Sequence, residues 1–558
     1  MQYRNPVANL GTHQVDNQPP PFEDVNRYTS DQVLVEAVGR EGAGFAELAF
    51  VELGDRVGSA EVQDQAVRAN RHPPELRAFD RFGRRIDEVE FHPAYHALMR
   101  LGIEAGVSSI AWTAASGGHA AHAALLYLMT AADAGVCCPL SMTYASIPTL
   151  RRQPDLACDW EPGIIAARYD AASRPAAEKA GVTIGMAMTE KQGGSDLRAT
   201  TTRAKALPGR GEFKLIGHKW FCSAPMSDAF FTLAQSAAGL SCFLVPRWRP
   251  DGSRNALHIM RLKDKLGDRS NASAEIEYHC AWARLVGDEG QGVRAIIDMV
   301  QGTRLDCMVG SAALMHNVLA AAIWHCTRRA VFGSALIEQP AMMKVLADLA
   351  LEQEAALALA FRLARAFDDA GTSATAAGLA RVLTPIAKYW ICKRAPSFVY
   401  EAMECHGGNG YVEESPLPRY FRQSPLNSIW EGSGNVIALD VLRAIKGCPA
   451  LLDTLLGELE HARGFDPRLD HVLTELPRLA THLDDRNARQ FCERMALAMQ
   501  ASILAVHAPS FVADGFVATR FDTAAPITYG AFAGTIDCQA IIARASPGRG
   551  SVDARACG

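Results

Sequence analysis

Residues 183–196 read TIGMAMTEKQGGSD, and they mark a change in the hydrophobic pattern of the chain. Ile184, Met186 and Met188 recur at every second position, which predicts a strand with one apolar face. The sequence before this stretch has a helical period, whereas the sequence after it breaks into short alternating segments. The stretch therefore predicts where a helical region gives way to a β domain.

The loop that follows this strand has the residues of a ligand-binding turn. Its glycines would let backbone N–H groups approach a planar or anionic ligand closely, and Thr189 and Ser195 offer hydroxyl groups. Taken alone, the loop is explained equally well as a surface turn. Other segments of the sequence are needed to distinguish a ligand-binding loop from a surface turn.

Short strand-like segments continue after this loop, separated by Gly, Pro, Asp and Asn. This spacing favours a small antiparallel β domain, which the GDEGQG turn at 287–292 would close. The predicted strands are 212–223, 228–235, 240–246, 257–262 and 274–279.

Helical periodicity flanks the β domain on both sides. From Ser30, a plausible N-cap, to about Gly181 the pattern is helical. Long helical runs at 293–328, 341–368 and 374–406, with a further helix from about Asn435 that carries Val436, Leu439 and Leu442, predict a four-helix bundle. Pro385 is expected to kink the third run, and Gly407 to end it.

The resulting fold class is α+β and multidomain. We expect an N-terminal arm with a helical domain, a β-barrel-like domain, a four-helix bundle and a C-terminal helical appendix with a disordered tail from Ser546. The boundaries are 1–181, 182–292, 293–446 and 447–558.

Composition excludes several classes of protein. The 558 residues carry 56 Lys and Arg against 61 Asp and Glu, so bulk positive charge for coating nucleic acid is absent. The cysteines form no C-x-x-C pair, which argues against a zinc ribbon or a dithiol centre and favours reduced, buried thiols. We find no signal peptide and no membrane span, because the most apolar run, 120–134, contains His122 and Asp133. A cytoplasmic protein is expected.

Four more segments could carry chemistry, although each also has an ordinary structural explanation. The aromatic residues of GHKWFCS would pack a β core, and the Arg of RAVFG would pair with a helix end. The glycines of ECHGGNGY would stop a helix, and the Glu of NSIWEGSGN would be a solvated charge before one. The segments are 217–223, 329–333, 404–411 and 427–435.

In this order and spacing, the segments resemble those of the acyl-CoA dehydrogenase family over residues 90–445. The shared motifs are the T-E-x-x-x-G-S-D loop, the G-x-K-x-aromatic-x-Ser strand, R-x-x-F-G, the GG-x-G segment and the E-G-(T/S) glutamate. The chain is most similar to the AidB-type branch, the alkylation-inducible flavoproteins of bacteria. That likeness rests on REGAG at 40–44, the loop at 188–196, KDKLGDRSNAS at 263–273 and SIWEGSGN at 428–435, and on the long appendix.

The resemblance implies an FAD-dependent oxidoreductase that acts on an acyl-CoA or a related activated acyl substrate. It implies that Glu431 removes the α-proton of an acyl thioester while the β-hydride passes to flavin N5, and that Trp430 partly desolvates the carboxylate. It further implies a homotetramer, in which some residues reach the FAD of a neighbouring subunit. The expected FAD contacts are Met188, Thr189, Gly194, Ser195, Phe221, Ser223, Arg329, Phe332, Gly407, Gly408, Trp430, Ser433 and Asn435.

Two departures from the family pattern concern the substrate. Glu404 replaces the usual Gln before the GG segment, and Lys191 replaces the usual Pro after Thr-Glu. Both are compatible with flavin binding. They put the ordinary contacts to a CoA substrate in doubt.

The alternative is an AidB-like flavoprotein that binds double-stranded DNA in the response to alkylation damage, with little dehydrogenase turnover. The resemblance places that binding in the C-terminal region. Residues 443–555 contain twelve Lys and Arg and thirteen Asp and Glu, so this region has no excess of positive charge. Arg486, Arg489 and Arg494 could form a basic face there, or a solvated helix face beside their acidic neighbours. A third possibility is that flavin is only a structural ligand.

Overall fold

The computed structural model describes residues 6–522 and 527–548. The chain forms two compact units, and each is described by itself. Unit 1 comprises residues 1–64, 119–131 and 307–558, and unit 2 comprises residues 65–118 and 132–306. These units divide the predicted N-terminal helical region, and the four-domain boundaries stay a prediction.

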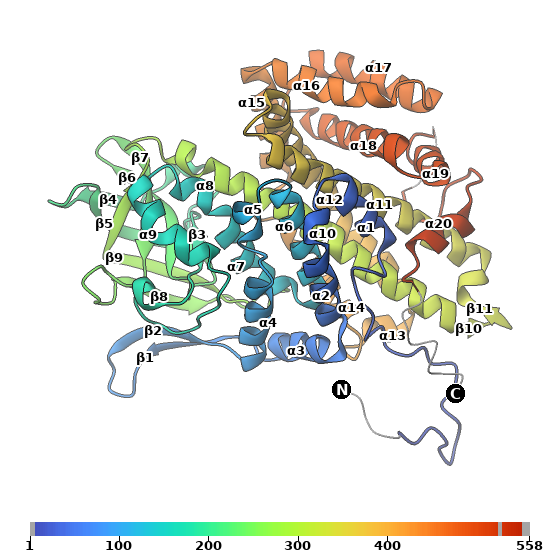
Figure 1. The fold of residues 1–558 in the computed structure, drawn as a ribbon, viewed down its shortest axis with the longest axis horizontal. Coiled ribbons are helices and arrows are strands. Elements are labelled where there is room, and N and C mark those ends of the chain that lie inside the picture. Colours follow the sequence, from blue (N-terminus) through green and yellow to red (C-terminus); the bar gives the residue numbers. More distant parts are fainter. Residues whose placement is uncertain (1–5, 523–526, 549–558) are drawn as a thin grey trace. The chain divides into compact units, whose positions relative to one another are not determined.

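Unit 2 contains a sheet of seven strands (Figure 1). They are β3 Ile184–Ala187, β4 Arg203–Ala206, β5 Glu212–Ser223, β6 Ala229–Ser236, β7 Gly239–Pro246, β8 Leu257–Leu262 and β9 Ser273–Val286. The order β3-β6-β4-β5-β9-β7, with β7 pairing again with β6, closes the barrel-like domain that the sequence predicts. Most pairs are antiparallel, but β3 and β4 each pair with β6 in parallel.

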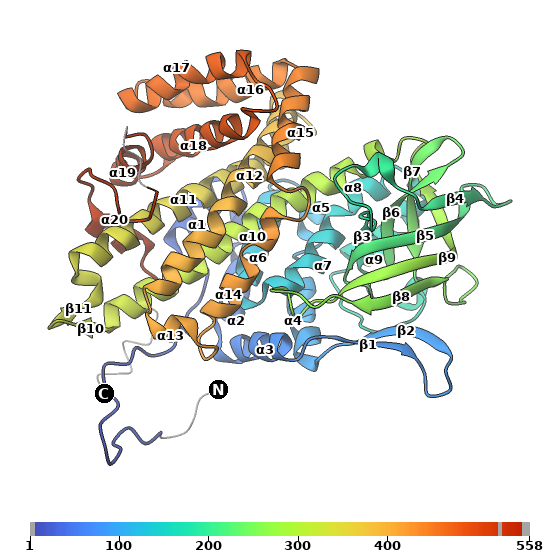
Figure 2. The same cartoon turned by 180° about the vertical axis from the view of Figure 1, so that it is seen from behind.

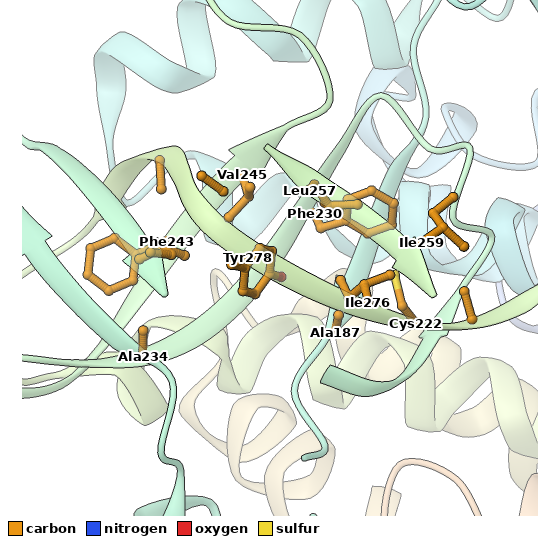
Figure 3. Close-up of a cluster of buried hydrophobic side chains, with 14 of the residues drawn as sticks. Ala187, Cys222, Phe230, Ala234, Phe243, Val245, Leu257, Ile259, Ile276 and Tyr278 are labelled. Atoms are coloured by element: carbon orange, nitrogen blue, oxygen red, sulfur yellow. The ribbon is translucent and has the colours of Figure 1, made fainter. Parts of the chain in front are cut away.

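The core of this sheet is made of apolar side chains that alternate inward along the strands. Phe230, Phe243 and Tyr278 are among its largest members, and Figure 3 shows them gathered between the strands. Phe213 meets Phe243 edge-on at 5.0 Å between ring centroids. The core fixes which face of each strand points outward, including the face of β5 that carries Phe221.

The N-terminal part of unit 2 corrects one prediction. Residues 75–90 were expected to be helical, but β1 Glu75–Phe79 and β2 Arg85–Glu90 form an antiparallel hairpin. Leu76, Val89 and the turn around Gly83 carry an alternating pattern that is too short to stand out within helical sequence. The helices of this part are α4 Pro93–Glu104, α5 Ile110–Thr113, α7 Ala134–Ala145, α8 Ile147–Leu150 and α9 Pro154–Ile165, and α3 Ala60–Arg71 leads into it.

Unit 1 is helical, and its centre is the predicted bundle. α11 Pro340–Asp369 packs against α12 Ala374–Glu404, which also contacts α15 Gly434–Gly447. Leu442 of α15 is buried, whereas Val436 and Leu439 are half-buried, so its apolar face is turned slightly from the predicted one. α12 remains one helix through Pro385, and Gly407 follows its C-cap with a φ of +59°.

The C-terminal appendix is helical and forms part of unit 1. α18 contacts α11, α12 and α15, and Figure 2 shows α16 and α17 lying beside α18. The helices are α16 Ala450–Leu459, α17 Pro467–Thr481, α18 Ala488–His507, α19 Ser510–Arg520 and α20 Cys538–Ala545. Of the disordered tail predicted from Ser546, residues 546–548 are described, and the Gly548 N–H donates to the Ser30 carbonyl at 3.3 Å. The rest of the predicted tail lies outside the described residues.

The remaining helices of unit 1 come from the N-terminal part of the chain. They include α1 Gln32–Arg40, α2 Glu47–Gly58 and the buried α6 Gly118–Ala132. The N-cap of α1 is Asp31 rather than Ser30, because the Asp31 carboxylate accepts a bond from the Leu34 N–H at 3.0 Å. The Ser30 hydroxyl donates instead to the Asn26 carbonyl.

The helix α10, Gly292–Arg328, is long and apolar enough to cross a membrane. However, 83% of its most apolar 18-residue stretch is buried within the protein, as in the core helix of a globular domain. We interpret it as a core helix, and the cytoplasmic location stays a prediction.

Candidate functional site

The loop after β3 is built around one carboxylate, that of Glu190. Its Oε2 accepts bonds from the Thr201 N–H and hydroxyl, both at 2.7 Å, and its Oε1 accepts from the Thr202 hydroxyl at 2.6 Å. The Lys219 ammonium lies 2.9 Å from Oε1. A single buried side chain therefore ties the loop to the segment before β4 and to β5.

The Glu190–Lys219 pair is ionised inside the β domain. Burial alone would raise the pKa of Glu190, but hydrogen bonds from Thr202 and the charge of Lys219 outweigh it and hold that pKa well below its ordinary range. Lys219 also donates to the Leu233 carbonyl at 2.9 Å. These motif residues fix the shape of the loop, and they are not exposed to a ligand.

The remaining loop residues present backbone and small side chains. Gly193 has a φ of +142°, and a Cβ on Gly194 would lie 2.4 Å from the Thr189 hydroxyl, so a side chain there would displace Thr189. Ser195 is exposed. The Trp220 N–H donates to the Thr189 carbonyl at 2.7 Å, which joins this loop to the outward face of β5.

β5 presents the predicted aromatic and hydroxyl groups. Phe221 is 51% exposed, an unusual state for a Phe within a barrel strand. Ser223 is half-buried, and its hydroxyl lies 3.5 Å from that of Ser273. Unit 2 thus brings Met188, Thr189, Gly194, Ser195, Phe221 and Ser223 onto one loop and its neighbouring strand.

In unit 1, Arg329 and Phe332 lie on the small hairpin of β10 Ala330–Val331 and β11 Ser334–Ala335. Phe332 is 98% exposed and has a φ of +52°. The Arg329 guanidinium donates to the Asn17 carbonyl. The ring therefore lies in solvent on a turn whose backbone conformation is strained.

The N-terminal arm holds this hairpin. The Asn17 side chain accepts from the Ala330 N–H at 2.7 Å and donates to the Ala330 carbonyl at 2.8 Å. The Trp324 indole donates to the Pro20 carbonyl at 2.9 Å. The arm is therefore held by its contacts with the hairpin and with α10.

Gly407 and Gly408 follow α12 at the start of the short helix α13 Gly408–Tyr411. A Cβ on either glycine would meet no atom within 4 Å. A side chain at position 408 would therefore fit, so packing does not explain the glycine there. The open backbone is compatible with the predicted contact to a nucleotide.

Glu431 lies in a loop between η5 Leu426–Ser428 and α15. The residue is half-buried, and its φ of +57° falls in the left-handed region, which is uncommon for a residue with a side chain. The Trp430 indole donates to the Asn427 amide oxygen at 3.0 Å, and the Asn427 amide nitrogen donates to the Ser311 hydroxyl at 3.1 Å. The loop is thereby tied to α10.

A lysine that sequence reasoning missed also holds this loop. The buried Lys388 ammonium, on α12, donates to the Trp430 carbonyl at 2.7 Å and to the Gly432 carbonyl at 2.6 Å. These carbonyls stand on either side of Glu431. A lysine within the apolar run TPIAKYWIC was the available signal, since buried lysine is rare without a specific partner.

The end of the loop carries Ser433 and Asn435, which are both exposed. A Cβ on Gly434 would lie 2.6 Å from the Lys393 side chain, so α12 approaches this position closely. The Asn435 amide oxygen accepts from Arg489 of α18 at 2.8 Å. The appendix therefore contacts the loop that carries Glu431.

The contact between Arg489 and Asn435 concerns the basic face that the sequence predicts as a possible DNA-binding surface. Arg489 binds the Asn435 side chain, whereas Arg486 pairs with Asp484 at 2.8 Å and is otherwise in solvent. The described contacts favour a loop-holding role for Arg489. DNA binding stays a prediction from the resemblance.

Models of known families match almost the whole chain up to residue 446. The AidB N-terminal domain matches residues 17–171, the acyl-CoA dehydrogenase middle domain residues 185–280, and the acyl-CoA dehydrogenase C-terminal domain residues 290–446.

Full-length relatives agree with these matches. The chain is 48% identical to AidB of Escherichia coli (strain K12) over 83% of its own length and 86% of that protein. It is also similar to the structure of Caenorhabditis elegans ACDH-11 in complex with C11-CoA, with a TM-score of 0.82, 27% identity, and coverage of 94% of this chain and 95% of that one. The apo-form of Bd2924 matches with a TM-score of 0.80 and 28% identity over 88% of this chain and 99% of that one. The chain belongs to the acyl-CoA dehydrogenase family, in its AidB branch.

Proposed function

We propose that the protein oxidises an acyl-CoA or a related acyl thioester, with Glu431 as the base that removes the α-proton. The observation that carries this proposal is the conformation of the Glu431 loop. A left-handed residue, costly in backbone energy, is held by contacts from α10 and α12. Such stored strain is typical of a residue whose orientation matters for function.

FAD is the cofactor of this family, and two sets of residues fit it. In unit 2, the open backbone at Gly193 and the exposed Phe221 ring suit a planar, anionic ligand. In unit 1, the glycines at 407 and 408 and the guanidinium of Arg329 suit a nucleotide and its pyrophosphate. When bound, FAD supplies the acceptor for the hydride that leaves the β carbon.

Glu431 carries out the proton half of the reaction. Its ionised carboxylate takes the proton from the α carbon, and the electron pair of that C–H bond forms the new double bond to the β carbon as hydride departs. Glu431 is half-buried and follows Trp430 in the sequence, and partial removal of a carboxylate from water strengthens it as a base. We propose that a backbone N–H of this loop polarises the thioester carbonyl, as the resemblance implies.

The acyl thioester class is supported by a relative, the ACDH-11 protein, whose structure was solved with C11-CoA. Lys191 and Glu404, which differ from the family pattern, are both exposed.

We also propose that the protein assembles as a homotetramer. The resemblance implies this assembly, and the exposed Phe332 ring, held at a φ of +52° on its hairpin turn, is a candidate contact with a neighbouring subunit. Sedimentation equilibrium of the FAD-loaded protein would yield the mass of four chains. A monomer across the whole concentration range would refute this assembly.

The base is tested by hydrogen exchange at the substrate. Anaerobic incubation of the FAD-loaded protein with acyl-CoAs in D₂O should introduce deuterium at the α carbon. Glu431→Gln should lose this exchange by at least about a hundredfold, since one general base contributes roughly 10²–10⁴. Exchange at the wild-type rate in Glu431→Gln would rule out the assignment.

A further inference from the structure

We propose that Lys388 is the positioning residue of Glu431: its ammonium holds the backbone on both sides of the base and so sets where the carboxylate points. The inference rests on the proposed role of Glu431. It adds a residue on a different element, α12, that touches neither substrate nor cofactor and acts through the loop.

The geometry places one ammonium between two carbonyls of the same turn. Lys388 Nζ lies 2.7 Å from the Trp430 oxygen and 2.6 Å from the Gly432 oxygen, and the side chain is 1% exposed. Residue 431 is the one residue between those two carbonyls. Its backbone therefore cannot rotate without breaking at least one of these two short bonds.

The cost of this arrangement favours a specific role for the lysine. Burial of an ammonium is expensive, and an apolar residue of the same length would pack into α12 without that cost. Within the described part of the chain this ammonium has two carbonyl partners and no ion pair. Hydrogen bonds from a charged donor are roughly twice as strong as neutral ones, which suits the ammonium to fix a strained turn.

The turn needs such a restraint because two consecutive residues have positive φ. Glu431 has a φ of +57° and Gly432 a φ of +106°. Only glycine adopts this region without penalty, so Glu431 would relax if the carbonyls were released. Relaxation would redirect the carboxylate, and a displacement of about 1 Å at a reacting group can cost about a hundredfold in rate.

The contact between α10 and the Glu431 loop involves other atoms than the contact from Lys388, so it does not replace the restraint on the turn. Ser311 and Asn427 hold the Trp430 indole, which lies before the base. The Gly432 carbonyl, after the base, is held by Lys388. Removal of Lys388 should therefore free the turn while the Trp430 side chain stays anchored.

The first test measures the loop itself and requires no turnover. In FAD-loaded Lys388→Met, amide hydrogen exchange of residues 430–434 should accelerate at least about tenfold relative to wild type, with α10 and α11 unchanged. Lys344→Met is the matched control, because Lys344 is a half-buried lysine of α11 that also donates to a backbone carbonyl, that of Phe532. Unchanged exchange of 430–434 in Lys388→Met would overturn the proposal.

The second test measures the base. Lys388→Met should slow anaerobic flavin reduction by acyl-CoA about ten- to a hundredfold, with FAD content and the Kd for acyl-CoA unchanged. In Lys388→Ala, added n-propylammonium should restore part of the rate, because it can occupy the vacated site. A purely structural lysine would lower stability without this split and without rescue.

The outcomes separate this inference from the proposed function. If the flavin of Lys388→Met is reduced as fast as that of wild type, the positioning role of Lys388 is refuted. The proposed role of Glu431 as the base is then unaffected. If wild type is never reduced, the dehydrogenase function fails, and loop exchange still decides whether Lys388 holds the turn. If Lys388→Met does not fold, the exchange measurement passes to Lys388→Gln, which retains N–H donors on a shorter chain and should give an intermediate rate.

Discussion

Glu190 and Lys219 show how single motif residues act through structure. Lys219→Met would leave the Glu190 carboxylate buried without its cation, which should destabilise the protein by about 3–5 kcal/mol in denaturant unfolding. Lys214→Met on the same strand is the control, since Lys214 is only half-buried, and it should stay within about 0.5 kcal/mol of wild type. Equal stability of the two variants would contradict this account of the loop.

The buried Asp268 of the KDKLGDRSNAS segment predicts a dependence of stability on pH. Burial, reinforced by the charge of Asp133 and partly offset by Lys265, raises the pKa of Asp268 from 3.8 to about 6. The folded state then holds its proton more tightly than the unfolded state. The free energy of unfolding should therefore fall as pH rises from about 4 to about 6, and become level above that range.

The variant Asp268→Asn isolates this contribution. Its stability relative to wild type should increase by up to about 3 kcal/mol between pH 4 and pH 6.5, as followed by denaturant midpoints. The difference between the two slopes is the relevant quantity, since other groups titrate equally in both proteins. Parallel curves would mean that Asp268 titrates normally.

At the residue scale, the sequence indicated candidate segments but not the contacts that each residue makes. The Thr-Glu loop and the Trp430–Glu431 loop were both identified. The roles of Glu190 and Lys388 were not, because their partners lie on other elements: Thr202 and Lys219 for the first, and the turn itself for the second. Such partners become visible only when the elements are packed.

At the scale of elements, the appendix is joined to the bundle by buried charge. Arg520 of α19 lies 2.7 Å from Asp348 and 2.9 Å from Glu352, both on α11. Glu352 also pairs with Arg394 of α12. The appendix is thus part of the core of unit 1, and its removal as a whole would damage the bundle.

Arg520→Met tests this attachment. It should cost about 3–5 kcal/mol and make α19 and α20 susceptible to proteolysis, because two buried carboxylates lose a cation. Arg486→Ala is the matched control, since Arg486 is 91% exposed at its side chain and its ion pair is worth little. Equal resistance of both variants would show that the charges do not hold the appendix.

The N-terminal arm makes a second element-scale prediction. Removal of residues 1–21 deletes Asn17 and should increase amide exchange across 329–335 at least about tenfold, because both bonds to Ala330 are lost. Removal of residues 1–12 retains Asn17 and should leave that exchange unchanged. A hairpin that remains protected without Asn17 would show that the arm does not order it.

The predicted elements were accurate where periodicity is long and uninterrupted. The bounds of α10, α11 and β5 agree with the sequence pattern to within a residue or two. β9 was predicted to end at His279 but continues to Val286, because Cys280, with a φ of +61°, lies at a bulge that shifts the alternation. β4 was too short to give a pattern at all.

At the scale of the whole molecule, the residues that we assign to FAD and to the base come from two units of one chain. Family membership supports the cofactor, and the held conformation of the Glu431 loop supports the base. The dehydrogenase function requires a bound FAD and a base that act on the same substrate. Reduction of flavin by substrate reports on the cofactor and the base at once.

The most direct test is therefore an anaerobic titration of the FAD-loaded protein with acyl-CoAs of increasing chain length, followed by flavin absorbance. We expect at least one acyl-CoA to bleach the oxidised flavin. Bleaching should be lost in Glu431→Gln with FAD retained, and preserved in Glu493→Gln, which removes an exposed carboxylate of α18. Flavin that stays oxidised with every acyl-CoA, or that bleaches equally fast in Glu431→Gln, would rule out Glu431 as the base of an acyl-CoA dehydrogenase.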